Sequence, residues 1–177
     1  MLKELWRDLH RSVCSISFLI NGKRISSGTG FRVGTKIITN NHVIQVPPAT
    51  HVIVHFVGAD GHSRIAEKAF SQQEFRSHLI DGEPESSWDY AILDMEIDEF
   101  KEIPTLRLKQ DDDIAIGTTI ALLGFQFDQS NLSIHTGILS SKYIRAGVNY
   151  LQLDASVNNG NSGGPLILPK QEKLSES

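Results

Sequence analysis

Short runs of β-branched and aromatic residues, separated by turn dipeptides, fill most of this chain and constrain its fold more than any other feature. The run HVIVHFV at 51–57, for example, lies between Pro48 and Gly58. The other runs are SVCSISFLI, GTGFRV, KIIT, DYAILDMEI, TTIALLGF, SIHTGILSSKYI, YLQLD and PLIL. The turn dipeptides are Asn21-Gly22, Asp60-Gly61 and Asp81-Gly82. Many short strands with little helix predict an all-β sandwich or barrel.

The remaining segments predict one helix and two connections. Leu2, Leu5, Trp6 and Leu9 recur at helical spacing, which predicts a short amphipathic helix at residues 2–10. The polar stretch at residues 71–88 is predicted to be a surface loop. Residues 109–117 are predicted to connect two halves, with the acidic run at 111–113 as a solvated loop.

Composition limits the class of protein and its partners. A chain of 177 residues with 40% hydrophobic residues suits one domain or two closely packed halves. The formal net charge is −4 without a basic block, which argues against nucleic acid or an anionic membrane as the main partner. Cys14 is the only cysteine and lies in an apolar run, so we expect it to be inert core. No signal-peptide pattern opens the chain, and we therefore expect a cytoplasmic location.

The stretch NNGNSGGPLIL at residues 158–168 surrounds Ser162 with glycines. A serine is a poor nucleophile until a base removes its proton. The Gly-x-Ser-x-Gly elbow of α/β-hydrolases needs an acid and a histidine after the serine, but residues 163–177 contain neither aspartate nor histidine. A subtilisin-like order needs an aspartate before the histidine, and only Asp8 precedes the first plausible one. The remaining order is His, Asp, Ser.

That order points to His42 and Asp89. His42 follows a predicted strand in ITNNHVI, where a polar turn can present an imidazole. Asp89 opens the apolar strand of WDYAILDME, where a carboxylate can be shielded from water and orient an imidazole N–H. Asp94 closes the same strand and is the less favoured alternative, because we expect it to be a solvated strand end. His51 and His55 lie four residues apart, but without an evident third ligand we expect no metal site.

Residues 12–168 resemble the trypsin-like serine peptidases, and more specifically their HtrA-type branch. The matching segments are GTGFRV, ITNNHVI, DYAILDM, GTTIALLGF, TGILSS and LQLDASVNNGNSGGPLI. The resemblance implies two packed antiparallel β-barrels, here at 12–103 and 112–177, with the active site between them. It also implies that His42 is the general base, Asp89 orients it and Ser162 is the nucleophile.

The resemblance further implies an oxyanion hole and a specificity pocket. The backbone N–H groups of Gly160 and Ser162 would bind the oxyanion. Trypsin has an aspartate six residues before its serine to bind basic side chains, whereas this chain has Ser156. Asn161 stands where secreted trypsin-like enzymes have an aspartate. Activation by a buried N-terminal amine is therefore not expected.

The family pattern places two more strands after PLIL, whereas this chain continues with PKQEKLSES. We therefore expect an incomplete second barrel, which a further domain or another chain could complete. The sequence predicts a serine endopeptidase that acts on protein or peptide substrates through an acyl-enzyme, without a cofactor. Two alternatives stay open at this stage. One is a degenerate protease that serves as a binding or regulatory module, and the other is an esterase that uses the same three residues.

Overall fold

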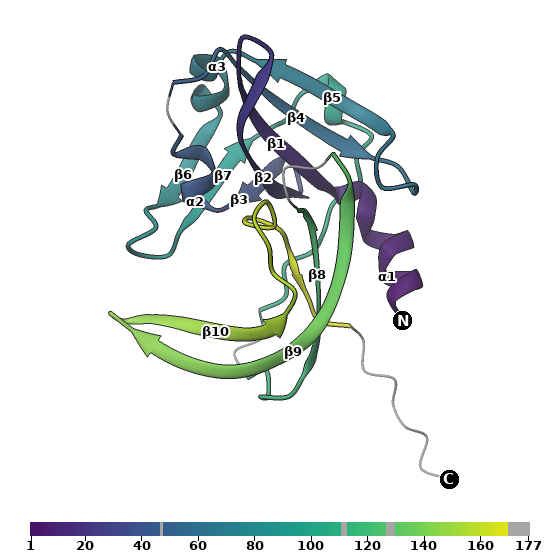
Figure 1. The fold of residues 1–177 in the computed structure, drawn as a ribbon, viewed down its shortest axis with the longest axis vertical. Coiled ribbons are helices and arrows are strands. Elements are labelled where there is room, and N and C mark those ends of the chain that lie inside the picture. Colours follow the sequence, from purple (N-terminus) through teal and green to yellow (C-terminus); the bar gives the residue numbers. More distant parts are fainter. Residues whose placement is uncertain (47, 111–112, 127–129, 170–177) are drawn as a thin grey trace.

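The computed structural model describes residues 1–46, 48–110, 113–126 and 130–169. Two antiparallel sheets form the molecule, one above the other in Figure 1. The seven-stranded sheet has the order β5-β4-β1-β2-β3-β7-β6, and the four-stranded sheet has the order β10-β9-β8-β11. The strands of the first sheet are β1 Val13–Ile20, β2 Lys23–Val33, β3 Lys36–Thr39, β4 His51–Val57, β5 Arg64–Phe70, β6 Leu79–Glu83 and β7 Tyr90–Asp94. Those of the second are β8 Thr119–Phe125, β9 Leu132–Arg145, β10 Val148–Ala155 and β11 Leu166–Ile167.

Helices are short and few in the described part of the chain. The α-helices are α1 Leu2–Leu9, α2 Asn41–Ile44 and α3 Gln72–Ser77, and 3₁₀ turns lie at His10–Ser12 and Asp98–Phe100. None of the described helices has the length and apolar character needed to cross a bilayer. The all-β fold and the N-terminal helix predicted from the sequence are confirmed.

The prediction of a loop at residues 71–88 is wrong, because this segment contains α3 and β6. Ser71 caps α3, its Oγ accepting a hydrogen bond from Glu74 N at 3.1 Å. Only Phe75 of α3 is buried, at 1% exposure. A single apolar residue produces no periodicity, so the sequence pattern could not reveal this helix.

Strand β5 was not among the predicted strands, and the strand predicted at PLIL is shorter than expected. β5 pairs with β4 at the edge of the first sheet, and most of its side chains are exposed or half-buried. Its polar composition therefore hides the alternation that marks a half-buried strand. β11 pairs with β8 at only two positions, Leu166 with Leu122 and Ile167 with Ala121.

The larger hydrophobic core lies within the seven-stranded sheet. Its aromatic members pack edge to face, with ring centroids 5.8 Å apart for Phe18 and Phe75 and 5.1 Å apart for Phe56 and Phe100. Cys14 belongs to this core, and its burial raises the pKa of the thiol to about 12. A smaller cluster joins the two sheets and consists of Val13, Val57, Leu123, Phe125 and Leu132.

We expect faster amide exchange in the second sheet than in the first. Within the described residues, β10 and β11 are unpaired on their outer sides, and several exposed apolar side chains lie on β9 and β10. Local opening is easiest where few buried contacts hold a strand. Hydrogen exchange followed by mass spectrometry should therefore show lower protection in residues 115–169 than in residues 12–100. Equal protection of the two halves would contradict this prediction.

His55 should make the fold sensitive to acid. Its side chain is 1% exposed, and neither ring nitrogen has a hydrogen-bond partner among the described residues. Its ring packs edge to face on Phe125, with the ring centroids 5.5 Å apart. Burial, with smaller contributions from the charges of Arg64 and Arg24, lowers the pKa of His55 from 6.5 to about 4, while the charge of Glu67 opposes this shift. The unfolded chain therefore binds the proton first as the pH falls. The free energy of unfolding should decrease between about pH 6.5 and 4, by up to about 3 kcal/mol.

Urea denaturation at a series of pH values tests this effect of His55. The His55→Phe variant cannot be protonated at this position and should lose less stability across the same pH interval. The exposed His51, on the same strand, provides the matched control, and His51→Phe should retain the wild-type dependence. An identical pH dependence in wild type and His55→Phe would refute the role of His55.

Candidate active site

Pairing between β3 and β7 brings His42 and Asp89 together. The last residue of β3, Thr39, pairs with Ala91 near the start of β7. His42 lies three residues after β3, and Asp89 lies immediately before β7. His42 is on the one-turn helix α2 rather than on the polar turn predicted from the sequence.

The Asp89 carboxylate binds the ring and the backbone of His42 at the same time. Its Oδ2 lies 2.6 Å from His42 Nδ1, and its Oδ1 accepts a hydrogen bond from His42 N at 2.9 Å. The two side chains are partly buried, at 36% and 21% exposure. A carboxylate at Nδ1 favours the tautomer with the proton on Nδ1, which leaves Nε2 free to accept a proton.

The backbone of Asp89 is held in an unusual conformation. Its φ is +48°, a left-handed value that costs energy for a residue other than glycine. Asn40 Nδ2 donates to the Asp89 carbonyl at 2.7 Å, and Asp89 N donates to the Pro84 carbonyl at 3.1 Å. These two bonds hold the carboxylate toward His42. Sequence reasoning missed Asn40, although the pair of asparagines before His42 was a visible signal.

Ser162 lies on a tight loop that reaches from the second sheet to the first (Figure 1, yellow segment). Gly160 and Gly163 both have positive φ, +96° and +88°. A Cβ on Gly163 would lie 2.0 Å from the Thr29 carbonyl oxygen and 3.2 Å from Asn40 N. The loop therefore passes directly beside the segment that leads to His42, and only glycine fits this close approach.

The Ser162 loop also leaves backbone donors available. The N–H of Asn161 donates to the Asn158 carbonyl at 3.2 Å, and the N–H of Gly164 donates to the Asn161 carbonyl at 2.9 Å. Within the described residues, neither the N–H of Gly160 nor that of Ser162 donates a hydrogen bond, and Ser162 Oγ makes none to His42. Two free N–H groups beside a serine can bind a developing negative charge.

Two further sequence-predicted residues, Ser156 and Asp94, make no hydrogen bond to His42 within the described residues. Ser156 is exposed and follows the end of β10, six residues before Ser162. Asn158 Nδ2, on the same loop, donates to Gln126 Oε1 at 2.9 Å, which ties the loop to the end of β8. Asp94 lies at the opposite end of β7 from Asp89, about 16 Å along the strand.

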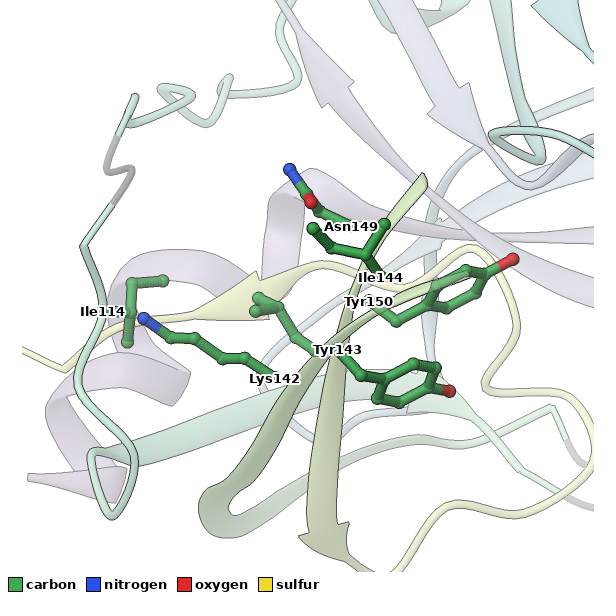
Figure 2. A pocket seen from close by; sticks show the side chains of 7 residues that line it. Ile114, Lys142, Tyr143, Ile144, Asn149 and Tyr150 are labelled. Atoms are coloured by element: carbon green, nitrogen blue, oxygen red, sulfur yellow. The ribbon is translucent and has the colours of Figure 1, made fainter. Parts of the chain in front are cut away.

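His42, Asp89 and Ser162 do not lie in the surface pocket of the β9–β10 hairpin, and the described residues form no cluster suited to a metal. A pocket of about 400 Å³ lies over the β9–β10 hairpin, where Tyr143 and Tyr150 stack at 5.2 Å (Figure 2). His42, Asp89 and Ser162 do not line it. Among the described residues, no three His, Cys, Asp or Glu side chains gather closely enough to hold a metal ion.

Two antiparallel sheets with a histidine–aspartate pair and a glycine-rich serine loop at their junction are typical of the trypsin-like class of serine hydrolases. The comparisons with known proteins agree. The chain belongs to the trypsin-like peptidase domain family, which it matches over residues 28–174, and to the HtrA branch of that family.

Two relatives of the HtrA branch share about a third of their aligned residues with this chain. A probable periplasmic serine endoprotease DegP-like of Ectopseudomonas mendocina is 34% identical over 155 residues, 83% of this chain and 28% of that protein. The Homo sapiens serine protease HTRA4 is 29% identical over 163 residues, 84% of this chain and 30% of that protein. The chain thus spans less than a third of the length of these relatives.

Solved structures share the fold. The HtrA-type protease AlgW with tripeptide superposes with a TM-score of 0.71 at 24% identity, over 94% of this chain and 50% of that one. The serine endoprotease from Yersinia pestis gives a TM-score of 0.69 at 24% identity, over 95% of this chain and 53% of that one.

The cytoplasmic location expected from the sequence is wrong. Relatives from several bacteria are named periplasmic serine endoproteases, which points to the periplasm or the cell exterior. The expectation depended on the absence of a signal-peptide pattern, and such an absence does not determine a location.

Proposed function

We propose that this chain is a serine endopeptidase domain in which His42, Asp89 and Ser162 form the catalytic triad. The observation that carries the proposal is the double hydrogen bond between Asp89 and His42 beside the glycine-rich Ser162 loop. The trypsin-like family membership and the names of the relatives support the same activity.

In this mechanism, His42 Nε2 removes the proton from Ser162 Oγ as that oxygen attacks the peptide carbonyl carbon. The negative charge that forms on the carbonyl oxygen is bound by the N–H groups of Gly160 and Ser162, which make no other hydrogen bond in the described structure. Protonated His42 then gives its proton to the leaving amine, and the acyl group stays on Ser162. Water activated by His42 hydrolyses the ester and releases Ser162. Asp89 stabilises the imidazolium throughout.

The proposed specificity follows from Ser156. No acidic side chain occupies this position, and the nearest upstream acid, Asp154, is exposed on β10. We therefore propose that cleavage does not require lysine or arginine before the scissile bond and that small or medium apolar side chains are preferred. For the whole protein, the names of the relatives favour action on proteins outside the cytoplasm.

A fluorophosphonate probe tests the proposed activity, because it forms a covalent bond only with an activated serine. Labelling should occur at Ser162 and should be lost in Ser162→Ala and His42→Ala. Labelling without cleavage of any protein or peptide, but with hydrolysis of small esters, would indicate an esterase instead. A correctly folded chain that the probe does not label would indicate a binding module without peptidase activity.

A further inference from the structure

Thr29 contacts three parts of the molecule: the Ser162 loop, Thr39 at the end of β3, and Phe125 of β8 in the second sheet. This residue of β2 is completely buried. Its N–H donates to the Ser162 carbonyl at 2.8 Å, and its hydroxyl donates to the Gly160 carbonyl at 2.7 Å. The same hydroxyl accepts a hydrogen bond from Phe125 N at 3.0 Å, and the Thr29 carbonyl accepts one from Thr39 Oγ1 at 2.7 Å.

The position of Thr29 in β2 explains why its backbone N–H is available to the Ser162 loop. β2 pairs with β3 from Val33 back to Phe31, and β3 ends at Thr39. Beyond that point the edge of β2 lacks its neighbouring strand. The Ser162 loop occupies this edge, with the Thr29 N–H bonded to Ser162 in place of a strand partner.

The hydroxyl group of Thr29 has a defined direction. A hydroxyl has one proton and two lone pairs. Because Phe125 N–H must donate to Thr29 Oγ1, the hydroxyl proton is free to point at the Gly160 carbonyl. One side chain of the first sheet therefore binds β8 of the second sheet and the serine loop together.

We propose that Thr29 is a positioning residue for the oxyanion-binding N–H groups, an inference that depends on the proposed peptidase function. Gly160 has a φ of +96° and no side chain to restrict it. Thr29 holds the Gly160 carbonyl through its hydroxyl and the Ser162 carbonyl through its N–H. The Asn161–Ser162 peptide lies between these two anchors, so its N–H is kept in one orientation.

The test compares three variants of the full 177-residue chain. Thr29→Val keeps the shape of the side chain but removes the hydroxyl, and Thr29→Ser keeps the hydroxyl. Thr136→Val is the matched control, because Thr136 Oγ1 donates to the Ile120 carbonyl at 3.1 Å, away from the serine loop. Circular dichroism establishes that each variant is folded. Should Thr29→Val not fold, Thr29→Ala replaces it, since alanine adds no methyl group beside the Gly160 carbonyl.

The first measurement is amide exchange of residues 156–165, which does not depend on activity. We expect faster exchange in Thr29→Val and wild-type exchange in Thr29→Ser and Thr136→Val. The second measurement is the rate of fluorophosphonate labelling of Ser162. Thr29→Val should be labelled about 10²-fold more slowly, the size of effect expected when an oxyanion donor is lost, while Thr29→Ser stays within about threefold of wild type. The pH at which labelling rises should not change, because the contacts of His42 with Asp89 remain.

Wild-type exchange in Thr29→Val would overturn the inference, as would a Thr29→Ser variant that exchanges and labels like Thr29→Val. In that second case packing of the methyl group, rather than the hydroxyl, would hold the loop. Failure of the wild-type chain to label refutes the proposed function, whereas the exchange comparison still decides whether Thr29 positions the loop.

Discussion

Ser162→Ala and His42→Ala should each lower peptidase turnover by about 10⁶, the largest effects expected for this chain. In the proposed mechanism, the Ser162 oxygen forms the acyl-enzyme. Without His42, the Ser162 hydroxyl keeps its proton and remains a poor nucleophile. Hydrolysis of an unfolded protein substrate, followed by release of peptides, measures the loss.

The two substitutions should not add, since the serine and its base act in a single step. The double variant should therefore be no slower than either single variant. Ser140→Ala serves as the control, because Ser140 Oγ donates to the Gln152 carbonyl within the β9–β10 hairpin, away from the loop. Substantial turnover in Ser162→Ala would assign the nucleophile to a different residue.

Asp89→Asn should lower turnover by about 10⁴ while preserving the fold. The asparagine amide would donate a hydrogen bond to His42 Nδ1, which forces the ring proton onto Nε2 and removes the general base. Asparagine is among the residues that tolerate a left-handed backbone, so the φ of +48° at this position does not oppose the substitution.

Asp94→Asn is the matched control for Asp89→Asn, with the same chemical change at the other end of β7. Asp94 is half-buried, and its carbonyl contacts His78 Nδ1 at 2.8 Å, a bond that the substitution leaves intact. Turnover should stay close to that of wild type, as measured with the same protein substrate. A loss in Asp94→Asn comparable to that in Asp89→Asn would reverse the assignment of the orienting carboxylate.

Most strands could be predicted from the sequence because their apolar residues alternate or form β-branched runs. The KIIT and HVIVHFV runs coincide with β3 and β4. β5, β6 and α3 were not predicted, because each contributes few buried residues to the core and is held by its neighbours. The periodicity of a sequence records burial, so elements with little burial leave a weak pattern.

The order of His42, Asp89 and Ser162 along the chain, and the glycines around the serine, are properties of the sequence alone. They favoured the trypsin-like class, because the residues exclude the α/β-hydrolase order and offer only one aspartate for the subtilisin order. Residues 163–177 contain no histidine or aspartate, which excludes the α/β-hydrolase order, and Asp8 is the only aspartate before His42.

Neither the contacts of Thr29 nor those of Asn40 could be predicted from the sequence, although the pair of asparagines before His42 marked the place of Asn40. Each is a common polar residue whose partner lies far along the chain, Gly160 for Thr29 and Asp89 for Asn40. Only the register of β2, β3 and β7 and the packing of the two sheets bring these partners within hydrogen-bond distance, because such a contact depends on three-dimensional position and not on local composition.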